Sequence, residues 1–188
     1  MPILDHFSLI APYYDRFIQA GEPEKLISLL SLPSGGRLLD IGGGTGRVSA
    51  AIRGRVAQIY VLDASFRMLI QASQKQGLSP VCSESERLPF TDCSFERIII
   101  VDALHHVANQ SKTAKDMWRV LKPGGLIVIE EPNLNMPGVK IIALAEKLLL
   151  MRSHLLTPEN ISRLFDGQRA NIRVETEEAS CWVVIEKT

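Results

Sequence analysis

The stretch that decides the fold lies near the start of the chain and reads Leu38-Leu39-Asp40-Ile41-Gly42-Gly43-Gly44-Thr45-Gly46-Arg47. Apolar residues lead into an acid and a glycine cluster, and a helix-like pattern resumes at Val48. This order predicts a buried strand, a tight turn and a helix N-terminus, which is how a βα unit receives a nucleotide. The dinucleotide fingerprint G-x-G-x-x-G would need a glycine at position 47, so the arginine found there disfavours a pyrophosphate ligand.

The segment from Asp40 to Gly46 resembles the first motif of class I S-adenosylmethionine-dependent methyltransferases, and most closely the small enzymes related to ubiquinone/menaquinone C-methyltransferases, the type 11 group. The resemblance implies an α/β fold, a Rossmann-like doubly wound sheet of seven strands in the order 3-2-1-4-5-7-6. Its last strand pair would end antiparallel, with helices on both faces of the sheet. A glycine-rich turn of another nucleotide-binding Rossmann protein, one that uses NAD for example, remains the alternative.

The same resemblance implies that S-adenosyl-L-methionine is the cofactor and S-adenosyl-L-homocysteine the product. The amino-acid tail of the cofactor would rest on the backbone of the glycine turn. The implied contacts in this motif are Asp40, Gly42, Gly43, Gly44 and Gly46.

A chain of 188 residues suits a single domain over 1–188, in which 1–32 would form an N-terminal helical cap and 134–170 a helical insertion on the substrate side. The formal net charge of zero argues against a nucleic-acid partner held through its phosphates. Three scattered cysteines without a C-x-x-C motif predict free thiols, no metal site and a reducing compartment. With no signal peptide at the N-terminus, we expect a cytoplasmic protein.

Near the N-terminus, Ala11-Pro12-Tyr13-Tyr14-Asp15 is similar to the A-x-x-Y-D element that these methyltransferases carry before their sheet. The resemblance implies that Tyr14 reaches over the methionine end of the cofactor and takes part in the catalytic site. A tyrosine that packs with its hydroxyl in water is the alternative.

The second predicted strand, 56–62, ends in Asp63, about twenty residues after the glycine turn. An acid at this strand tip can accept hydrogen bonds from both ribose hydroxyls. It could instead cap the following helix, although Ser65 can serve as that cap. The resemblance also adds Ala64 to the cofactor site and places Met68 against the adenine, where core packing would explain Met68 nearly as well.

The segment Glu84-Ser85-Glu86-Arg87-Leu88-Pro89-Phe90 follows a short predicted strand, 80–82, and resembles the family's G-D-A-E-x-L-P-F segment. The resemblance implies that the Glu84 carboxylate accepts from the adenine amino group and that the Ser85 backbone N–H contacts the ring. A polar surface loop without a ligand is the alternative.

The β-branched run 95–101 predicts a central parallel strand, and Asp102-Ala103-Leu104-His105-His106-Val107 follows it. This segment is similar to the family's L-H-H-V, which implies that Asp102, His105 and His106 face the cofactor or the acceptor. Adjacent histidines on a helix point in different directions, and we favour His105 as the one that faces the cavity. Either could act as a general base.

After the turn at 122–125 and a strand at 126–129, the match with the family weakens. Residues 137–152 are predicted to form a helix with a broad apolar face, and the charges at Lys140, Glu146 and Lys147 argue against a membrane span. A helix buried on the sheet, a lid over the substrate, a dimer contact and a peripheral membrane contact all fit it. Alternation over 171–177 and 180–187 predicts the final antiparallel hairpin.

Taken together, these motifs predict an enzyme that moves a methyl group from S-adenosylmethionine to a small acceptor, one that is apolar or resembles a quinone or a lipid. A protein that binds the cofactor without catalysis, as a partner or sensor, is a second hypothesis. A nicotinamide-dependent oxidoreductase is a third, which the glycine spacing disfavours.

Overall fold

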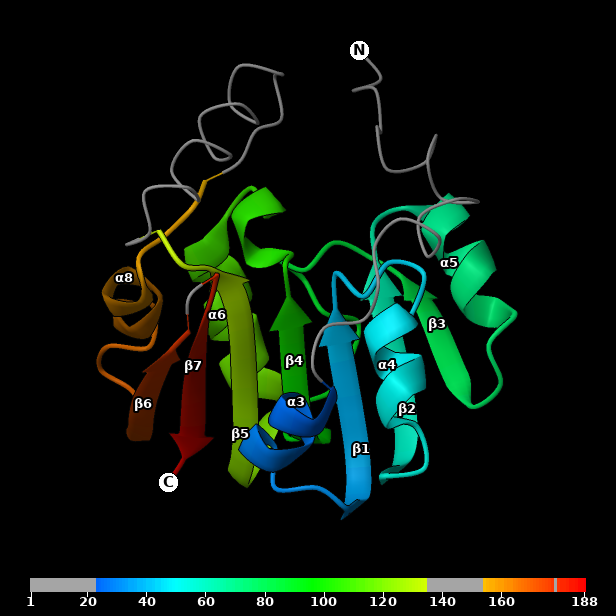
Figure 1. The fold of residues 1–188 in the computed structure, drawn as a ribbon, viewed down its shortest axis with the longest axis horizontal. Coiled ribbons are helices and arrows are strands. Elements are labelled where there is room, and N and C mark those ends of the chain that lie inside the picture. The colour runs from blue at the N-terminus through cyan, green and yellow to red at the C-terminus, as the bar shows by residue number, and fades with distance from the viewer. Residues whose placement is uncertain (1–22, 135–153, 178) are drawn as a thin grey trace.

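In a computed structural model of the chain, residues 23–134, 154–177 and 179–188 are described. Seven strands form one sheet in the order β3-β2-β1-β4-β5-β7-β6, as predicted (Figure 1). The strands are β1 Ser34–Ile41, β2 Val56–Asp63, β3 Leu78–Cys82, β4 Phe95–Val101, β5 Leu121–Pro132, β6 Ala170–Thr176 and β7 Ser180–Lys187. The strands from β1 to β5 pair in parallel, while β7 pairs antiparallel with both β5 and β6.

The helices cover both faces of this sheet (Figure 1). They are α3 Pro23–Leu29, α4 Arg47–Ile52, α5 Phe66–Ser73, the short 3-10 helix η1 Leu104–His106, α6 Gln110–Val120 and α8 Pro158–Arg163. Side chains of α3, α4 and α5 belong to one buried cluster, and those of α6 and α8 belong to the other. The fold is therefore the doubly wound arrangement that the sequence predicted.

Alternation along the central strands explains why both faces are apolar. In β4, Ile98 and Ile100 enter the cluster under α6 and α8, whereas Ile99 enters the cluster under α3 to α5. All three side chains are fully buried, and β1 alternates in the same way. A parallel strand covered on two faces needs apolar residues at every position, which is why these strands have near-continuous apolar runs.

The sheet has its switch point between β1 and β4. From β1, the chain passes to β2 on one side, and it later returns to β4 on the other side. Loops that leave two such strands diverge, so a crevice opens beyond their carboxyl ends, where doubly wound folds bind ligands. The glycine turn, Asp63 and η1 all follow strand ends at this edge of the sheet.

The fifth strand is longer than the predicted 126–129. Leu121 pairs with Phe95, and the next paired position, Leu126, lies opposite Arg97, so residues 122–125 form an irregularity within β5 rather than a turn before it. The buried side chain of Leu121 explains the extra pairing, because it completes the apolar cluster at the foot of β4. The final hairpin is confirmed.

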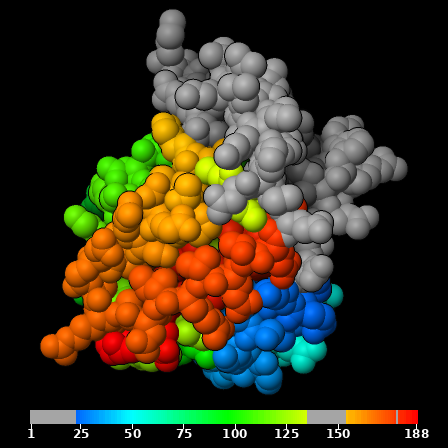
Figure 2. Space-filling view, turned by 60° about the vertical axis from the view of Figure 1, so that its left-hand side comes forward, coloured from blue at the N-terminus to red at the C-terminus, as the bar shows by residue number. Residues whose placement is uncertain are grey.

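At the outer edge of the sheet, the C-terminal hairpin meets α3. Figure 2 shows this edge, with the β6 hairpin in orange next to the early part of the chain in blue. The Lys25 ammonium lies 2.6 Å from a Glu175 oxygen and 3.1 Å from a Glu177 oxygen, which ties α3 to the C-terminal hairpin.

The predicted division into cap and insertion stays largely a prediction. Residues 1–22 and 135–153 lie outside the described residues, and with them most of the cap and of the apolar segment 137–152. Among the residues that are described, no helix has the length and apolar character that crossing a bilayer requires.

Candidate active site

The turn after β1 brings bare backbone to the edge of the sheet. Gly42, Gly44 and Gly46 have φ values of +67°, +55° and +73°, a conformation that other residues adopt only with strain. An added Cβ at Gly42 would lie 2.6 Å from the Ala103 Cβ, so the loop is packed closely against the segment after β4. Above Gly44, by contrast, the nearest atom to an added Cβ is a carboxylate oxygen of Asp63 at 3.9 Å.

Asp40 supports this loop from below. Its carboxylate is 1% exposed and accepts a hydrogen bond from the Ser49 hydroxyl at 2.7 Å. An added Cβ on Gly43 would lie 2.6 Å from its Cγ, so the loop crosses directly over it. Burial raises the pKa of Asp40 to about 7. A direct contact between Asp40 and the cofactor stays a prediction.

Asp63, at the tip of β2, joins two elements of the crevice. One carboxylate oxygen accepts from the Gly44 N–H at 2.9 Å and the other accepts from the Ser65 N–H at 2.7 Å. The expectation that the Ser65 side chain caps α5 is wrong: Ser65 is the N-cap residue, but the cap has no side-chain hydrogen bond. The carboxylate is half-buried, and carboxylate oxygens can each accept more than one hydrogen bond, so ribose contacts remain compatible with these bonds.

The other predicted nucleoside contacts lie around Asp63. Ala64 and Glu84 are exposed, Ser85 is half-buried, and Met68 is 3% exposed within the core. The Ser83 N–H donates to the Asp63 carbonyl at 3.1 Å, which fixes the loop after β3 next to the end of β2. The structure thus places the loop after β3 next to the end of β2, while the contacts of Ala64, Met68, Glu84 and Ser85 with a cofactor stay predictions.

The two histidines of η1 differ from our expectation. Their rings are in contact, with centroids 4.0 Å apart, rather than pointing in different directions. His105, which we favoured, is only 5% exposed, and its Nδ1 lies 2.6 Å from a Glu131 oxygen. His106 is half-buried and is the more accessible of the two. A 3-10 helix of three residues fixes both rings through this buried pair, which sequence spacing does not reveal.

The protonation of His106 follows from its surroundings. Burial, and then the positive charge of His105, lowers the pKa of His106 to about 4. At neutral pH its imidazole is therefore uncharged and can accept a proton or a hydrogen bond.

Glu131 is the site residue that our sequence reasoning missed. It is 1% exposed at the carboxyl end of β5, and its second oxygen accepts from the Leu104 N–H at 2.8 Å. One carboxylate therefore holds both the start of η1 and the His105 ring. Its signal in the sequence was an acid directly after an apolar strand, at the edge where ligands bind.

A second cluster of charged side chains comes from β5, α4 and the residue after β4, namely Glu130, Arg47 and Asp102. Asp102 has a φ of +50°, an uncommon conformation for a residue other than glycine, and its carboxylate lies 3.7 Å from the Arg47 guanidinium. Burial and the charge of Asp102 raise the pKa of Glu130 to about 7. Arg47, the residue that breaks the dinucleotide fingerprint, thus stands among carboxylates. Tyr14, the remaining predicted site residue, lies outside the described residues.

Comparisons with known proteins agree with this geometry. The methyltransferase domain family matches residues 39–129. Ubiquinone/menaquinone biosynthesis C-methyltransferase UbiE of Pseudomonas aeruginosa is 30% identical over 202 residues, covering 97% of this chain and 79% of that protein. The UbiE of Geotalea daltonii is 33% identical over 146 residues, covering 69% of this chain and 62% of its own length. The chain belongs to the UbiE family of class I S-adenosylmethionine-dependent methyltransferases.

Solved structures share the fold at lower identity. A Thermotoga maritima S-adenosylmethionine-dependent methyltransferase, described as a possible histamine N-methyltransferase, has a TM-score of 0.81 at 19% identity and covers 99% of this chain and 100% of its own. The [4+2]-cyclase SpnF has a TM-score of 0.80 at 15% identity, with 97% of this chain and 93% of its own covered. These two likenesses speak for the fold alone.

S-adenosylmethionine is the cofactor of this methyltransferase, and the described residues fit it. Among the described residues, only a carboxylate oxygen of Asp63 comes within 4 Å of a Cβ added at Gly44, so these residues leave the turn's backbone open beside the carboxylate at the tip of β2. These are the two features that a nucleoside with an amino-acid tail needs at a switch point, a loop without side chains and an acceptor for sugar hydroxyls.

Proposed function

We propose that this methyltransferase transfers the methyl group to a ring carbon of a small, apolar, quinone-like acceptor. The names of its UbiE relatives support this acceptor class. The observation that carries the proposal is the arrangement at this sheet edge, where Asp63 bonds the glycine turn and the turn packs against Ala103, directly before the histidines of η1.

Bound S-adenosylmethionine supplies an activated methyl group on a positively charged sulfur. The chain therefore has to align the acceptor, exclude water and receive one proton. Methylation at a ring carbon is completed when that carbon loses its proton and aromaticity returns. Because this proton is acidic, a weak base suffices, and His106 with a pKa of about 4 is uncharged and able to accept it.

His105 would act on this base indirectly. Its Nδ1 is held by Glu131, so its ring orientation is fixed, and its electrostatic effect adds to burial in lowering the pKa of His106. We propose that the pair keeps His106 available as a base through the neutral pH range, while Tyr14 covers the methionine end of the cofactor. Contact of 137–152 with a membrane surface or a second copy of the chain remains part of this proposal.

The first test concerns the cofactor. Asp63→Ala is expected to weaken S-adenosylhomocysteine binding at least about tenfold, since it removes a charged hydrogen-bond acceptor. Asp166→Ala, at an exposed aspartate in the loop after α8, is the matched control and should bind like the wild type. Isothermal titration calorimetry measures both. Unchanged affinity in Asp63→Ala would remove Asp63 from the ribose site, and a thermal shift with NAD but none with S-adenosylmethionine would refute the cofactor assignment.

The second test concerns the acceptor and the base. With a naphthoquinol that lacks its ring methyl as acceptor, His106→Ala should lower turnover far more than it lowers cofactor affinity. His105→Ala should do the same and should also lower the melting temperature, because one oxygen of the buried Glu131 carboxylate loses its histidine partner. Equal losses of turnover and cofactor affinity would count against the base. Tight cofactor binding without transfer to any quinol would favour the non-catalytic hypothesis.

A further inference from the structure

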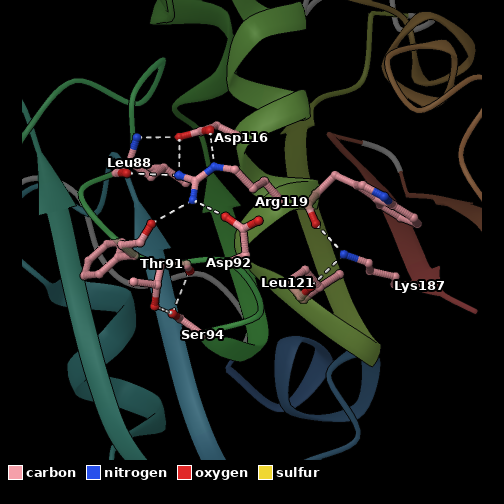
Figure 3. Close-up of polar contacts among 10 residues, drawn as sticks. Leu88, Thr91, Asp92, Ser94, Asp116, Arg119, Leu121 and Lys187 are labelled. Carbon is pink, nitrogen blue, oxygen red and sulfur yellow. Dashed lines mark hydrogen bonds and ion pairs between the residues drawn. The ribbon is translucent and has the colours of Figure 1, made fainter.

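One face of α6 holds the loop that follows β3. Thr113, Asp116 and Arg119 are spaced three residues apart and therefore share a face of the helix. Each of them forms a hydrogen bond with a residue between 85 and 92. Figure 3 shows the bonds of Asp116 and Arg119. This loop has no helix or strand of its own, so its conformation depends on such contacts.

Arg119 uses its full hydrogen-bonding capacity here. Its guanidinium donates to the Leu88 carbonyl at 3.1 Å, the Phe90 carbonyl at 2.7 Å and an Asp92 carboxylate oxygen at 2.9 Å. Two further bonds of 2.7 and 3.0 Å go to the two carboxylate oxygens of Asp116. These five bonds match the five N–H donors of arginine, and no other side chain offers that number in one plane.

Asp116 and Arg119 together form a clamp on the loop after β3, in which Asp116 bonds the N–H of Leu88 and Arg119 bonds its carbonyl. Besides the two hydrogen bonds from Arg119, the Asp116 carboxylate also accepts one from the Leu88 N–H at 2.6 Å. Leu88 is therefore held at both its N–H and its carbonyl, and its side chain is 3% exposed in the core. With this residue fixed, the loop has little freedom between the core and the end of β3.

The clamped residues continue directly into the crevice. Glu86 accepts from the Asn109 N–H at 3.0 Å, and the Ser85 hydroxyl lies 3.1 Å from that of Thr113. Ser83 bonds the carbonyl of Asp63 at 3.1 Å. A nucleoside whose sugar lies at Asp63 and whose tail lies on the glycine turn must extend its base toward this loop, because the turn and the loop flank Asp63 on opposite sides.

We propose that Arg119 and Asp116 are positioning residues for the base of the bound nucleoside, and that they set the preference for a purine with an exocyclic amino group. They act through the backbone of 84–88 rather than by touching the ligand. The inference rests on the cofactor site described above. It predicts that selectivity for adenine depends on side chains at the far end of α6.

If Arg119 and Asp116 served only the stability of the fold, their substitution would have a different effect. It would change the melting temperature but leave unchanged the ratio of affinities for two nucleosides that differ only in the base. S-adenosylhomocysteine and S-inosylhomocysteine form such a pair, since the second carries a carbonyl oxygen in place of the amino group. Their affinity ratio is therefore a readout that a purely structural role does not move.

The experiment measures both dissociation constants by calorimetry in the full chain. Wild type is expected to prefer the adenosyl compound by about tenfold or more, the effect of one well-made hydrogen bond to a charged group. In Arg119→Met the ratio should fall to within about twofold, with a weaker adenosyl affinity. Arg119→Lys keeps the charge but has three donors, so its ratio should be intermediate. Asp116→Asn, whose amide NH2 must face an N–H of either Leu88 or Arg119, serves as a second and milder variant.

Lys187→Met is the matched control at the same end of α6. The Lys187 ammonium donates to the carbonyls of Trp118 at 2.6 Å and Leu121 at 2.8 Å, but has no bond to the loop (Figure 3). It should lower the melting temperature and leave the affinity ratio unchanged. A wild-type ratio near one, or a wild-type ratio retained in Arg119→Met and Asp116→Asn, would overturn the inference alone. A wild type that binds neither compound would overturn the methyltransferase assignment and this inference with it.

Discussion

Gly46→Ala tests the close packing beneath the glycine turn. Gly46 has a φ of +73°, and an added Cβ would lie 2.6 Å from Leu78 Cδ1 and 3.4 Å from the Ala72 Cβ. Gly124 offers a matched control, since its φ is also +73° but an added Cβ would meet nothing within 4 Å. The two substitutions share the backbone strain and differ in the steric conflict.

The expected losses in the free energy of unfolding follow from the backbone strain and the steric conflict. A left-handed conformation costs alanine about 1–2 kcal/mol, of which about 0.4–1 kcal/mol is offset because alanine restricts the unfolded chain. Gly124→Ala should therefore lose about 1 kcal/mol. Overpacking adds about 1–3 kcal/mol in Gly46→Ala, because the half-buried Leu78 side chain must shift away from the added methyl group and the buried Ala72 lies close behind it. We expect a loss of about 2–4 kcal/mol there.

Urea unfolding followed by circular dichroism measures both losses, and the melting temperature should fall by about 2–4 °C for each kcal/mol in a chain of this size. Gly46→Ala should also weaken S-adenosylhomocysteine binding, because relief of the conflict moves the turn, while Gly124→Ala should bind normally. If both variants lose the same stability within about 0.5 kcal/mol, the close approach of Gly46 to β3 plays no part and the reasoning fails.

Three further predictions concern other sites. Burial raises the pKa of Asp40 from 3.8 to about 7, so the stabilisation tied to its proton is complete below pH 3.8 and is lost as the pH rises through 7. Asp40→Asn should flatten this decline, which is on the order of 4 kcal/mol, in urea unfolding across pH 4–8. Glu131→Gln replaces the carboxylate that bonds His105 Nδ1, so the electrostatic effect of His105 on His106 should weaken. The pKa of His106 should rise above about 4 in an NMR titration but stay below 6.5, because burial is the larger cause of its shift; an unmoved value would show that burial alone depresses it. Thr157→Ala removes the N-cap of α8 and should cost about 1 kcal/mol by thermal unfolding, whereas an unchanged melting temperature would mean that the helix does not depend on its cap.

The strands were predictable because their causes are local. A β-branched run such as 95–101 can be buried only as a central parallel strand, and the structure has β4 at those residues. The limits of the fifth strand were not predictable in the same way. Leu121 joins β5 because it pairs with Phe95, a contact between residues far apart in sequence, while the intervening Pro123 and Gly124 look locally like the end of an element.

The same distinction between local and long-range causes applies to the residues of the candidate active site. Motif positions found the glycine turn and Asp63, since both depend on the order of residues along one βα unit. The orientation of the histidines could not be found, because it is decided by Glu131 on a neighbouring strand. The dependence of the base-side loop on Arg119 was equally hidden, since an arginine in the last turn of a helix normally indicates only a solvated charge.

The charges around the glycine turn suit a cationic ligand better than an anionic one. Asp63, Asp102 and Glu130 border the crevice, and Arg47 stands among them. S-adenosylmethionine carries a net positive charge, and its demethylated product is neutral, so the same carboxylates favour the substrate form of the cofactor over the product form. A bound cation also stabilises ionised carboxylates and thus lowers the pKa of Glu130 from its raised value of about 7. We therefore expect S-adenosylmethionine to bind with release of protons near neutral pH and S-adenosylhomocysteine to bind with a smaller release. Calorimetry in buffers of different ionisation enthalpy measures that difference, and equal proton release by the two ligands would contradict this account of the crevice.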